Sequence, residues 1–248
     1  MPFTLAHPAA VVFLKNKKFN LTALILGSMA PDFIYFLNFR PYGNLGHQIL
    51  GFFILNLPLC ILLAYIFHNF IKSPLISHLP RPLDNWYGYL RTEQFGLHSW
   101  KEVIVFIYSA LLGMITHVLW DGFTHKTGFF VRHITWLQQK IIIFDGHEIY
   151  IYKLVQHTST VIGIIIVLFF LYKLRDSNTR ILWGHKSFKD KFIYDLIVII
   201  TAIIVLVLSY IIFKYLSIPY RIGNFVVSSI NGIFIGIFIG ILIASFKK

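Results

Sequence analysis

Five long stretches without a charged side chain constrain this chain more than any other feature. They cover residues 41–71, 103–120, 154–172, 196–213 and 222–246. Each is close to or longer than the ~20 apolar residues that an α-helix needs to cross a bilayer. Only 13% of the 248 residues are charged, against roughly 25% in a soluble domain. The sequence therefore predicts an all-α, polytopic membrane protein.

A sixth apolar stretch, residues 19–39, contains the break Met29-Ala30-Pro31-Asp32. The break frees backbone groups that lipid cannot satisfy, so it must face protein or water. We predict a bundle of about six spans, preceded by a short N-terminal helix within residues 3–14, either a half-helix or a surface helix. The opening MPFTLAHPAA has no basic region before its apolar residues, unlike a removable signal peptide. We expect it to remain in the mature protein.

The net charge of +12 raises the question of nucleic-acid binding. If six spans alternate across the membrane, fifteen Lys and Arg fall on one side and seven on the other. That asymmetry is the positive-inside pattern of membrane proteins, and it explains the charge without nucleic acid. We therefore expect an integral protein of the plasma membrane, the inner membrane in bacteria, with membrane lipid as its partner. The oligomeric state is not predicted.

The chain is predicted to have three parts. Residues 1–173 form a membrane-embedded domain, residues 174–191 form a basic cytoplasmic connector, and residues 192–248 form two C-terminal membrane helices. In the last helix three glycines recur every four residues, at Gly232, Gly236 and Gly240. This pattern predicts a close approach by a neighbouring helix. The only cysteine, Cys60, excludes a disulfide framework and a cysteine-based zinc site.

A pair of potential metal ligands lies near the end of the third long stretch. His117 and Asp121 are four residues apart, so on a helix they share one face. His125 lies eight residues from His117, a rise of ~12 Å, which is far beyond one coordination sphere. It can join the same ion only if the helix breaks at Gly122. Otherwise it could bind a second metal.

Membrane depth selects further candidates. Asp32, His47 and His157 all fall at the end of a span that lies on the same predicted side as the His117–Asp121 pair, the extracytoplasmic face. Imidazole and carboxylate ligands together suit zinc, manganese or iron and leave a position for water, which implies hydrolysis. The predicted metal ligands are Asp32, His47, His117, Asp121 and His157, and less strongly His7 and His125. Asp145 or Glu148, in the loop at 122–154, is the candidate general base.

Five motifs in order resemble the bacterial DUF4184 family of membrane proteins. They are MPFTLAHPAA at the start, GSMAPDF at 27–33, GHQILGFF at 46–53, THVLWDGFTHKTG at 116–128 and YKLVQHTSTVIG at 152–163. The resemblance covers residues 1 to about 170. That family is similar in turn to membrane-bound metal-dependent hydrolases of the inner membrane, which also carry an early His, a Pro-Asp, a later His and a His-x-x-x-Asp.

A fainter similarity reaches the zinc phospholipases C and the S1/P1 nucleases, in which His-x-x-x-Asp supplies ligands to a zinc cluster. It implies a phosphoester substrate and zinc, with one or two ions. The residues that match are Asp32, His47, His117 and Asp121, followed by His7 and His157. The N-terminal tryptophan ligand and the second helical pair, His-x-x-x-Glu, of those enzymes are absent from this sequence. The number of ions is therefore left open.

The leading hypothesis is a membrane-bound metal-dependent hydrolase acting on a phosphoester such as a lipid headgroup. Two alternatives stay open at this point. In a transporter or channel, Asp32 and the histidines would form an ion or proton path. In a non-catalytic scaffold, the buried polar side chains would only fasten helices to one another.

Overall fold

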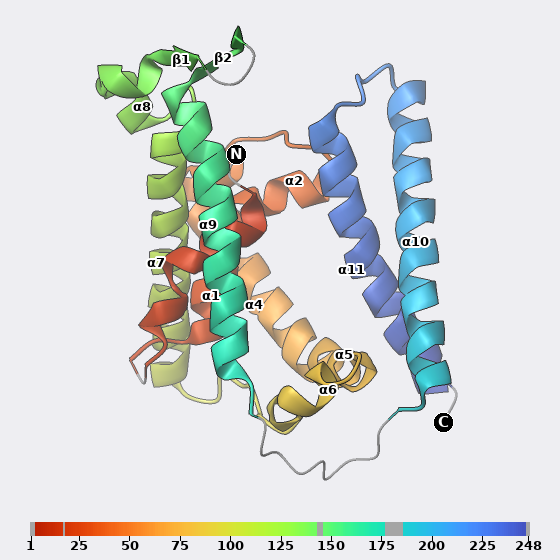
Figure 1. Cartoon of the computed structure of the whole chain (residues 1–248). Helices are drawn as coiled ribbons and strands as arrows, with labels where there is room; N and C mark the ends of the chain where they lie inside the picture. The colour runs from red at the N-terminus through yellow and green to blue at the C-terminus, as the bar shows by residue number, and fades with distance from the viewer. Residues whose placement is uncertain (1–2, 17, 143–145, 177–185, 247–248) are drawn as a thin grey trace. The chain divides into compact units, whose positions relative to one another are not determined.

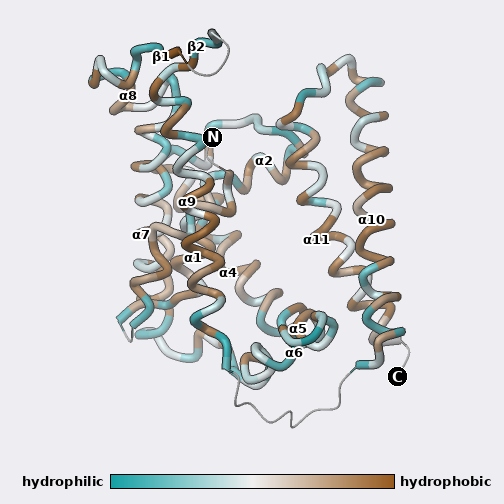
Figure 2. Tube along the Cα trace, viewed as in Figure 1, coloured by the Kyte–Doolittle hydropathy of each residue, from teal (hydrophilic) through white to brown (hydrophobic). Residues whose placement is uncertain are grey.

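The computed structural model describes residues 3–16, 18–142, 146–176 and 186–246 (Figure 1). Five helical runs are long and apolar enough to cross a membrane, and Figure 2 shows their largely hydrophobic residues. They are Ile49–His78, Trp100–His133, Ile151–Leu174, Phe188–Tyr215 and Ile222–Ala244. The prediction of an all-α, multi-pass membrane protein is confirmed.

The sixth predicted span is a shorter, broken helix, Leu21–Leu37. Helix α1 (Leu21–Met29) begins where the Asn20 side chain accepts a hydrogen bond from the Ala23 amide. It is followed by a 3₁₀ turn, Ala30–Asp32, and by helix α2 (Phe33–Leu37). The predicted break is therefore present, and Asp32 lies at its end.

The short N-terminal helix is also present, as the 3₁₀ helices Thr4–Ala10 and Val12–Leu14. This segment is buried rather than lying on a surface, because Ala6 and His7 are almost fully covered. Gly163 of a later helix allows the close packing, since a Cβ there would lie 2.9 Å from the Ala6 carbonyl oxygen.

The chain divides into two compact units, which are described separately. Unit 1 comprises Met1–Asp32, Leu45–Ala64 and Leu97–Lys173. Unit 2 comprises Phe33–Asn44, Tyr65–Gly96 and Leu174–Lys248. The three-part division at residues 173 and 191 stays a prediction.

Unit 1 is built from helices and one small hairpin. Its elements after α1 are α3 (Ile49–Gly51), a π-helical turn (Phe52–Asn56), most of α4 (Leu57–Ile66), α7 (Trp100–Thr124), α8 (Phe129–His133), a 3₁₀ turn (Thr135–Gln138), β1 (Lys140–Ile142), β2 (Glu148–Tyr150) and α9 (Ile151–Leu174). The two strands are antiparallel, with Ile141 opposite Ile149. Before α3, residues Leu45–His47 form a 3₁₀ turn, so the helix begins later than the uncharged stretch at residue 41.

Helices α1 and α7 lie side by side in unit 1 (Figure 1). Two glycines permit the contact. A Cβ on Gly27 would lie 2.2 Å from the Ala110 carbonyl oxygen, and one on Gly113 would lie 2.5 Å from the Leu24 carbonyl oxygen. The two backbones are therefore in contact. This contact fixes the position of α7 along its own axis relative to the break that follows α1.

Unit 2 contains α2, the end of α4, a π-helical turn (Phe67–Ile71), α5 (Lys72–His78), α6 (Leu83–Trp86), a 3₁₀ turn (Gly88–Arg91), α10 (Phe188–Tyr215) and α11 (Ile222–Phe246). The last two are packed against each other through the glycine stripe. A Cβ on Gly232 would lie 2.8 Å from the Ala202 Cα atom, and one on Gly236 would lie 2.8 Å from the Val198 carbonyl oxygen. The predicted role of the glycines in close helix packing is confirmed.

Candidate metal centre

The His117–Asp121 pair lies on one face of α7, as the four-residue spacing requires. The His117 Nε2 atom is 3.4 Å from Asp121 Oδ2. Both side chains are buried. A carboxylate and an imidazole at this depth are costly to bury unless they serve a site.

Asp32 and His47 approach the same point from two other segments. Asp32 Oδ1 is 3.6 Å from His117 Nε2, and His47 Nε2 is 3.6 Å from Asp32 Oδ1 and 3.4 Å from Asp121 Oδ2. Gly46 allows the turn before His47 to reach the break, because a Cβ on Gly46 would lie 2.2 Å from the Pro31 carbonyl oxygen. We call Asp32, His47, His117 and Asp121 together the polar centre.

The spacing within the polar centre matches a metal-ligand set. The nitrogen–oxygen separations between its imidazoles and carboxylates are 3.4–3.6 Å. In a tetrahedral zinc site with bonds of about 2.1 Å, ligand atoms lie about 3.4 Å from one another. These separations are longer than the ~2.9 Å of good hydrogen bonds. Indeed Asp32 Oδ1 and His117 Nε2 are buried without a hydrogen-bond partner among the described residues.

Two further contacts orient the ligand atoms. The Nδ1–H group of His117 donates to the Ser28 carbonyl oxygen at 2.7 Å, which leaves the Nε2 lone pair for the centre. The Thr4 hydroxyl donates to Asp32 Oδ2 at 2.6 Å, so that Oδ1 faces the centre. Partners of this kind fix the tautomer and the direction of metal ligands. Thr4 and Ser28 were not identified from sequence, and Ser28 gives no side-chain signal because it acts through its carbonyl group.

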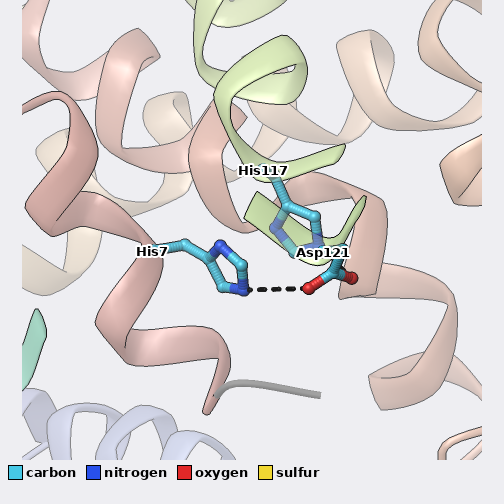
Figure 3. Close-up of side chains that lie close together, drawn as sticks. All are labelled: His7, His117 and Asp121. Carbon is cyan, nitrogen blue, oxygen red and sulfur yellow. Dashed lines mark ion pairs between the residues drawn. The ribbon is translucent and has the colours of Figure 1, made fainter. Parts of the chain in front are cut away.

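His7 lies on the other side of Asp121 (Figure 3). Its Nε2 atom is 3.7 Å from Asp121 Oδ1, and its ring stacks on that of His117 with centroids 3.8 Å apart. Neither nitrogen of His7 has a hydrogen-bond partner in the described part of the chain. Burial, followed by the neighbouring His117, lowers the pKa of His7 well below its usual value. His7 is thus neutral, as a metal ligand must be, and with His117 and Asp121 it forms a second group that could hold an ion.

His125 touches Asp121 but differs from the other histidines. Helix α7 does not break at Gly122. It continues to Thr124, and His125 follows in an extended conformation. The His125 Nδ1 atom lies 3.0 Å from the Asp121 carbonyl oxygen and 3.4 Å from Asp121 Oδ1. Because a carbonyl can only accept, this nitrogen carries the proton and donates it to the backbone of Asp121.

The structure does not bring the other predicted residues to the polar centre. His157 is exposed on α9 and Gln156 is the buried neighbour, because successive helical residues point about 100° apart. Glu148 is exposed on β2, where its Oε2 atom lies 2.7 Å from Lys140 Nζ and this hydrogen bond raises the pKa of Lys140. Asp145 lies outside the described residues.

Fold and site together define a multi-pass helical membrane protein with a buried histidine–aspartate centre. Residues 1–246 match the family described as Domain of unknown function (DUF4184), and the chain belongs to that family. The match extends beyond the predicted limit at about residue 170. No curated protein and no solved structure matches the chain.

Proposed function

We propose that this chain is a membrane-bound, metal-dependent hydrolase that acts on a phosphoester such as a lipid headgroup. The spacing of the polar centre supports the proposal: two imidazole nitrogens and two carboxylate oxygens converge at 3.4–3.6 Å. This donor set is typical of zinc. Asp32, His47, His117 and Asp121 would hold the first ion. His7 would serve a second ion together with the other oxygen of Asp121.

A divalent cation in such a site supplies a nucleophilic water near neutral pH and polarises a phosphoryl oxygen. The chain's own residues prepare the site for it. Thr4 and Ser28 orient Asp32 and His117, while His125 bonds the backbone carbonyl group of Asp121 at the end of α7. We propose that the substrate approaches past His47, because its side chain is 22% exposed whereas those of Asp32 and His117 are fully covered.

The two alternatives have less support. In a scaffold the two acids and two imidazoles of the polar centre would bond one another directly, whereas their mutual separations of 3.4–3.6 Å are longer than those of good hydrogen bonds. A path for ions through unit 1 would need polar groups along α1 and α7 beyond the centre. There the two helices meet backbone to backbone at Gly27 and Gly113.

Hydrolysis by the purified full-length chain tests the proposal. The protein is stripped with a chelator, reloaded with zinc, and assayed on phosphomonoester, phosphodiester and phospholipid substrates. We expect turnover by the wild type and by the control His133→Ala, whose exposed imidazole bonds only its own helix. His47→Ala should lose at least about a hundredfold, because one ligand of the ion is gone. Zinc-loaded wild type without turnover, or equal rates in both variants, would contradict the proposal.

We also propose that the polar centre faces the extracytoplasmic side of the inner membrane. The unequal division of Lys and Arg between the two sides supports this orientation. Cys60 is fully buried, so we expect a maleimide reagent to label only cysteines that are introduced on the surface. A membrane-impermeant maleimide applied to intact cells should label Gln139→Cys in the loop that follows α8 and not Lys189→Cys on α10. The reverse pattern would exclude this orientation.

A further inference from the structure

Unit 2 has a small cavity at one end of the α10–α11 pair, separate from the polar centre. Its volume is about 180 Å³, and it lies between the first turns of α10, the last turns of α11 and the end of α5. Its polar lining comes from His78, Lys186, Asp190 and Tyr194, and its apolar lining includes Ile193 and Ile243. Pockets for drug-sized ligands are about 300 Å³ or more, so this cavity suits a smaller chemical group.

Two buried side chains in the cavity have polar atoms available for a ligand. Tyr194 is only 5% exposed, and its hydroxyl has no hydrogen-bond partner among the described residues. Its ring is held between His78, with centroids 4.4 Å apart, and Gly240, where a Cβ would lie 2.8 Å from the ring. The position of the hydroxyl is therefore fixed, and a buried hydroxyl without a partner is destabilising unless a ligand bonds it.

His78 presents one ring nitrogen in the same way. Its Nδ1–H group donates to the Pro74 carbonyl oxygen at 2.8 Å, which leaves Nε2 for another partner. His78 is 4% exposed. Two aromatic side chains that are fixed and almost fully buried, one of them with an unpartnered hydroxyl among the described residues, make this a built site rather than an accidental gap.

The charged residues of the cavity have opposite signs. Lys186 is half-buried and Asp190 is exposed, and both line the cavity. The nearby Lys191 is engaged elsewhere, since its Nζ atom contacts the Asp84 carboxylate and the Leu79 carbonyl oxygen. A cation and an anion in the lining favour a ligand that carries both charges.

The position of the cavity indicates the source of such a ligand. The helices α10 and α11 are both long enough to span a bilayer, and the cavity lies at their ends. Headgroups occupy that depth, and acyl chains lie against the apolar side chains further along the spans. Ile193 and Ile243 border the cavity on the helices that continue into the membrane.

We propose that this cavity binds the headgroup of a zwitterionic phospholipid of the phosphate–amine type. The phosphate lies against Lys186 and the Tyr194 hydroxyl, and the amine lies against Asp190. The acyl chains follow Ile193 and Ile243. This site is independent of the polar centre and of the function proposed for it.

Native mass spectrometry of the full-length chain in detergent tests the proposal. The protein is titrated with phosphatidylethanolamine, with phosphatidylglycerol and with soluble glycerophosphoethanolamine. We expect the wild type to prefer phosphatidylethanolamine and to bind the soluble headgroup much more weakly. Tyr194→Phe removes only the hydroxyl and should weaken phosphatidylethanolamine binding about tenfold, since a hydrogen bond to a charged group is lost.

Three further variants sharpen the result. Lys186→Met, at the edge of the cavity, should weaken the same lipid about tenfold without a change in packing. Asp190→Asn should abolish the preference for phosphatidylethanolamine over phosphatidylglycerol. Lys189→Met is the matched control and should bind as the wild type does, because Lys189 is exposed and does not line the cavity.

Three outcomes would overturn the proposal. The first is equal lipid binding by Tyr194→Phe, Lys186→Met and Lys189→Met. The second is a wild type that prefers phosphatidylglycerol. The third is binding of the soluble headgroup as tight as binding of the lipid, which would assign the cavity to a free metabolite.

Discussion

The polar centre of unit 1 and the Lys191–Asp84 pair of unit 2 hold buried charged side chains in opposite ways. In unit 2, Lys191 contacts the Asp84 carboxylate, and the Asn231 side-chain amide donates to the Phe36 carbonyl oxygen at 2.7 Å. These groups are satisfied by direct partners, and Lys191 donates to the Leu79 carbonyl oxygen as well. In the polar centre of unit 1, acids and imidazoles face one another at 3.4–3.6 Å, and buried atoms such as His117 Nε2 have no hydrogen-bond partner in the part of the chain that the structure describes.

On the function proposed above, this difference separates polar groups that stabilise the fold from polar groups that bind a ligand. A direct ion pair stabilises the contact between its two segments once both charges are buried. Imidazole and carboxylate groups at metal-ligand spacing do not stabilise one another in that way, and the proposed ion would supply the partner that their burial requires. The four predictions below test this separation, from the largest expected effect to the smallest.

The largest effect is expected from His117→Ala combined with Asp121→Ala. Elemental analysis of the detergent-purified full chain should find metal in the wild type and only background in the double variant, because half of the polar centre is removed. The affinity for zinc should fall by at least about a hundredfold. Lys191→Met with Asp84→Leu is the control from unit 2 and should retain the metal. Equal metal content in the two double variants would show that the polar centre does not differ from the Lys191–Asp84 pair in metal binding.

Lys191→Met alone should destabilise the protein by about 3 kcal/mol, because it leaves the buried Asp84 carboxylate without its partner. Adding Asp84→Leu should restore most of that loss, since an apolar pair of similar size can replace a buried ion pair. Chemical unfolding in detergent measures both. If single and double variants are equally stable, the pair does not fasten unit 2.

The close contact beneath the polar centre is tested by Gly27→Ala. The new methyl group would meet the Ala110 carbonyl oxygen at 2.2 Å, so α1 and α7 must separate at a cost of about 2 kcal/mol. Gly88→Ala is the matched control, because a Cβ there meets nothing within 4 Å. Unfolding midpoints distinguish them, and a Gly27 variant as stable as the Gly88 variant would show that the helices do not touch.

The smallest effect is expected from Thr4→Val. It removes the hydroxyl that donates to Asp32 Oδ2 and keeps the shape of the side chain, so zinc affinity should fall about tenfold. Thr158→Val is the control, because the hydroxyl of Thr158 bonds only carbonyl oxygens of its own helix. Competition with a chelator dye measures both affinities. An unchanged affinity in Thr4→Val would show that this contact does not orient the carboxylate.

Several features could be predicted from the sequence because they depend only on residues that are close together in the chain. Uncharged stretches indicate spans whatever surrounds them, and the four-residue spacing of His117 and Asp121 places both on one helix face. The break at Pro31 could likewise be predicted, since a proline interrupts the hydrogen bonds of a helix. These features survive in the structure as α7 and as the turn between α1 and α2.

Other features depend on direction around a helix or on contacts between distant segments. His157 was predicted as a ligand from its depth in the membrane. Depth does not say to which side of the helix a side chain points, and the neighbouring residue Gln156 is the buried one. The stacking of His7 on His117 could not be predicted, because it joins residues that are far apart in the chain. The approach of His125 depended on where α7 ends, at Thr124 rather than Gly122.

The polar centre is assembled from segments scattered along the chain, with Asp32 and His47 early and His117 and Asp121 on α7. While the protein is being synthesised, the early segments are inserted with only part of the centre present. A nascent chain that stops before Trp100 lacks both residues of α7 and the imidazole that bonds the Ser28 carbonyl group. The ion that we propose for this centre could therefore be captured only after α7 has been inserted.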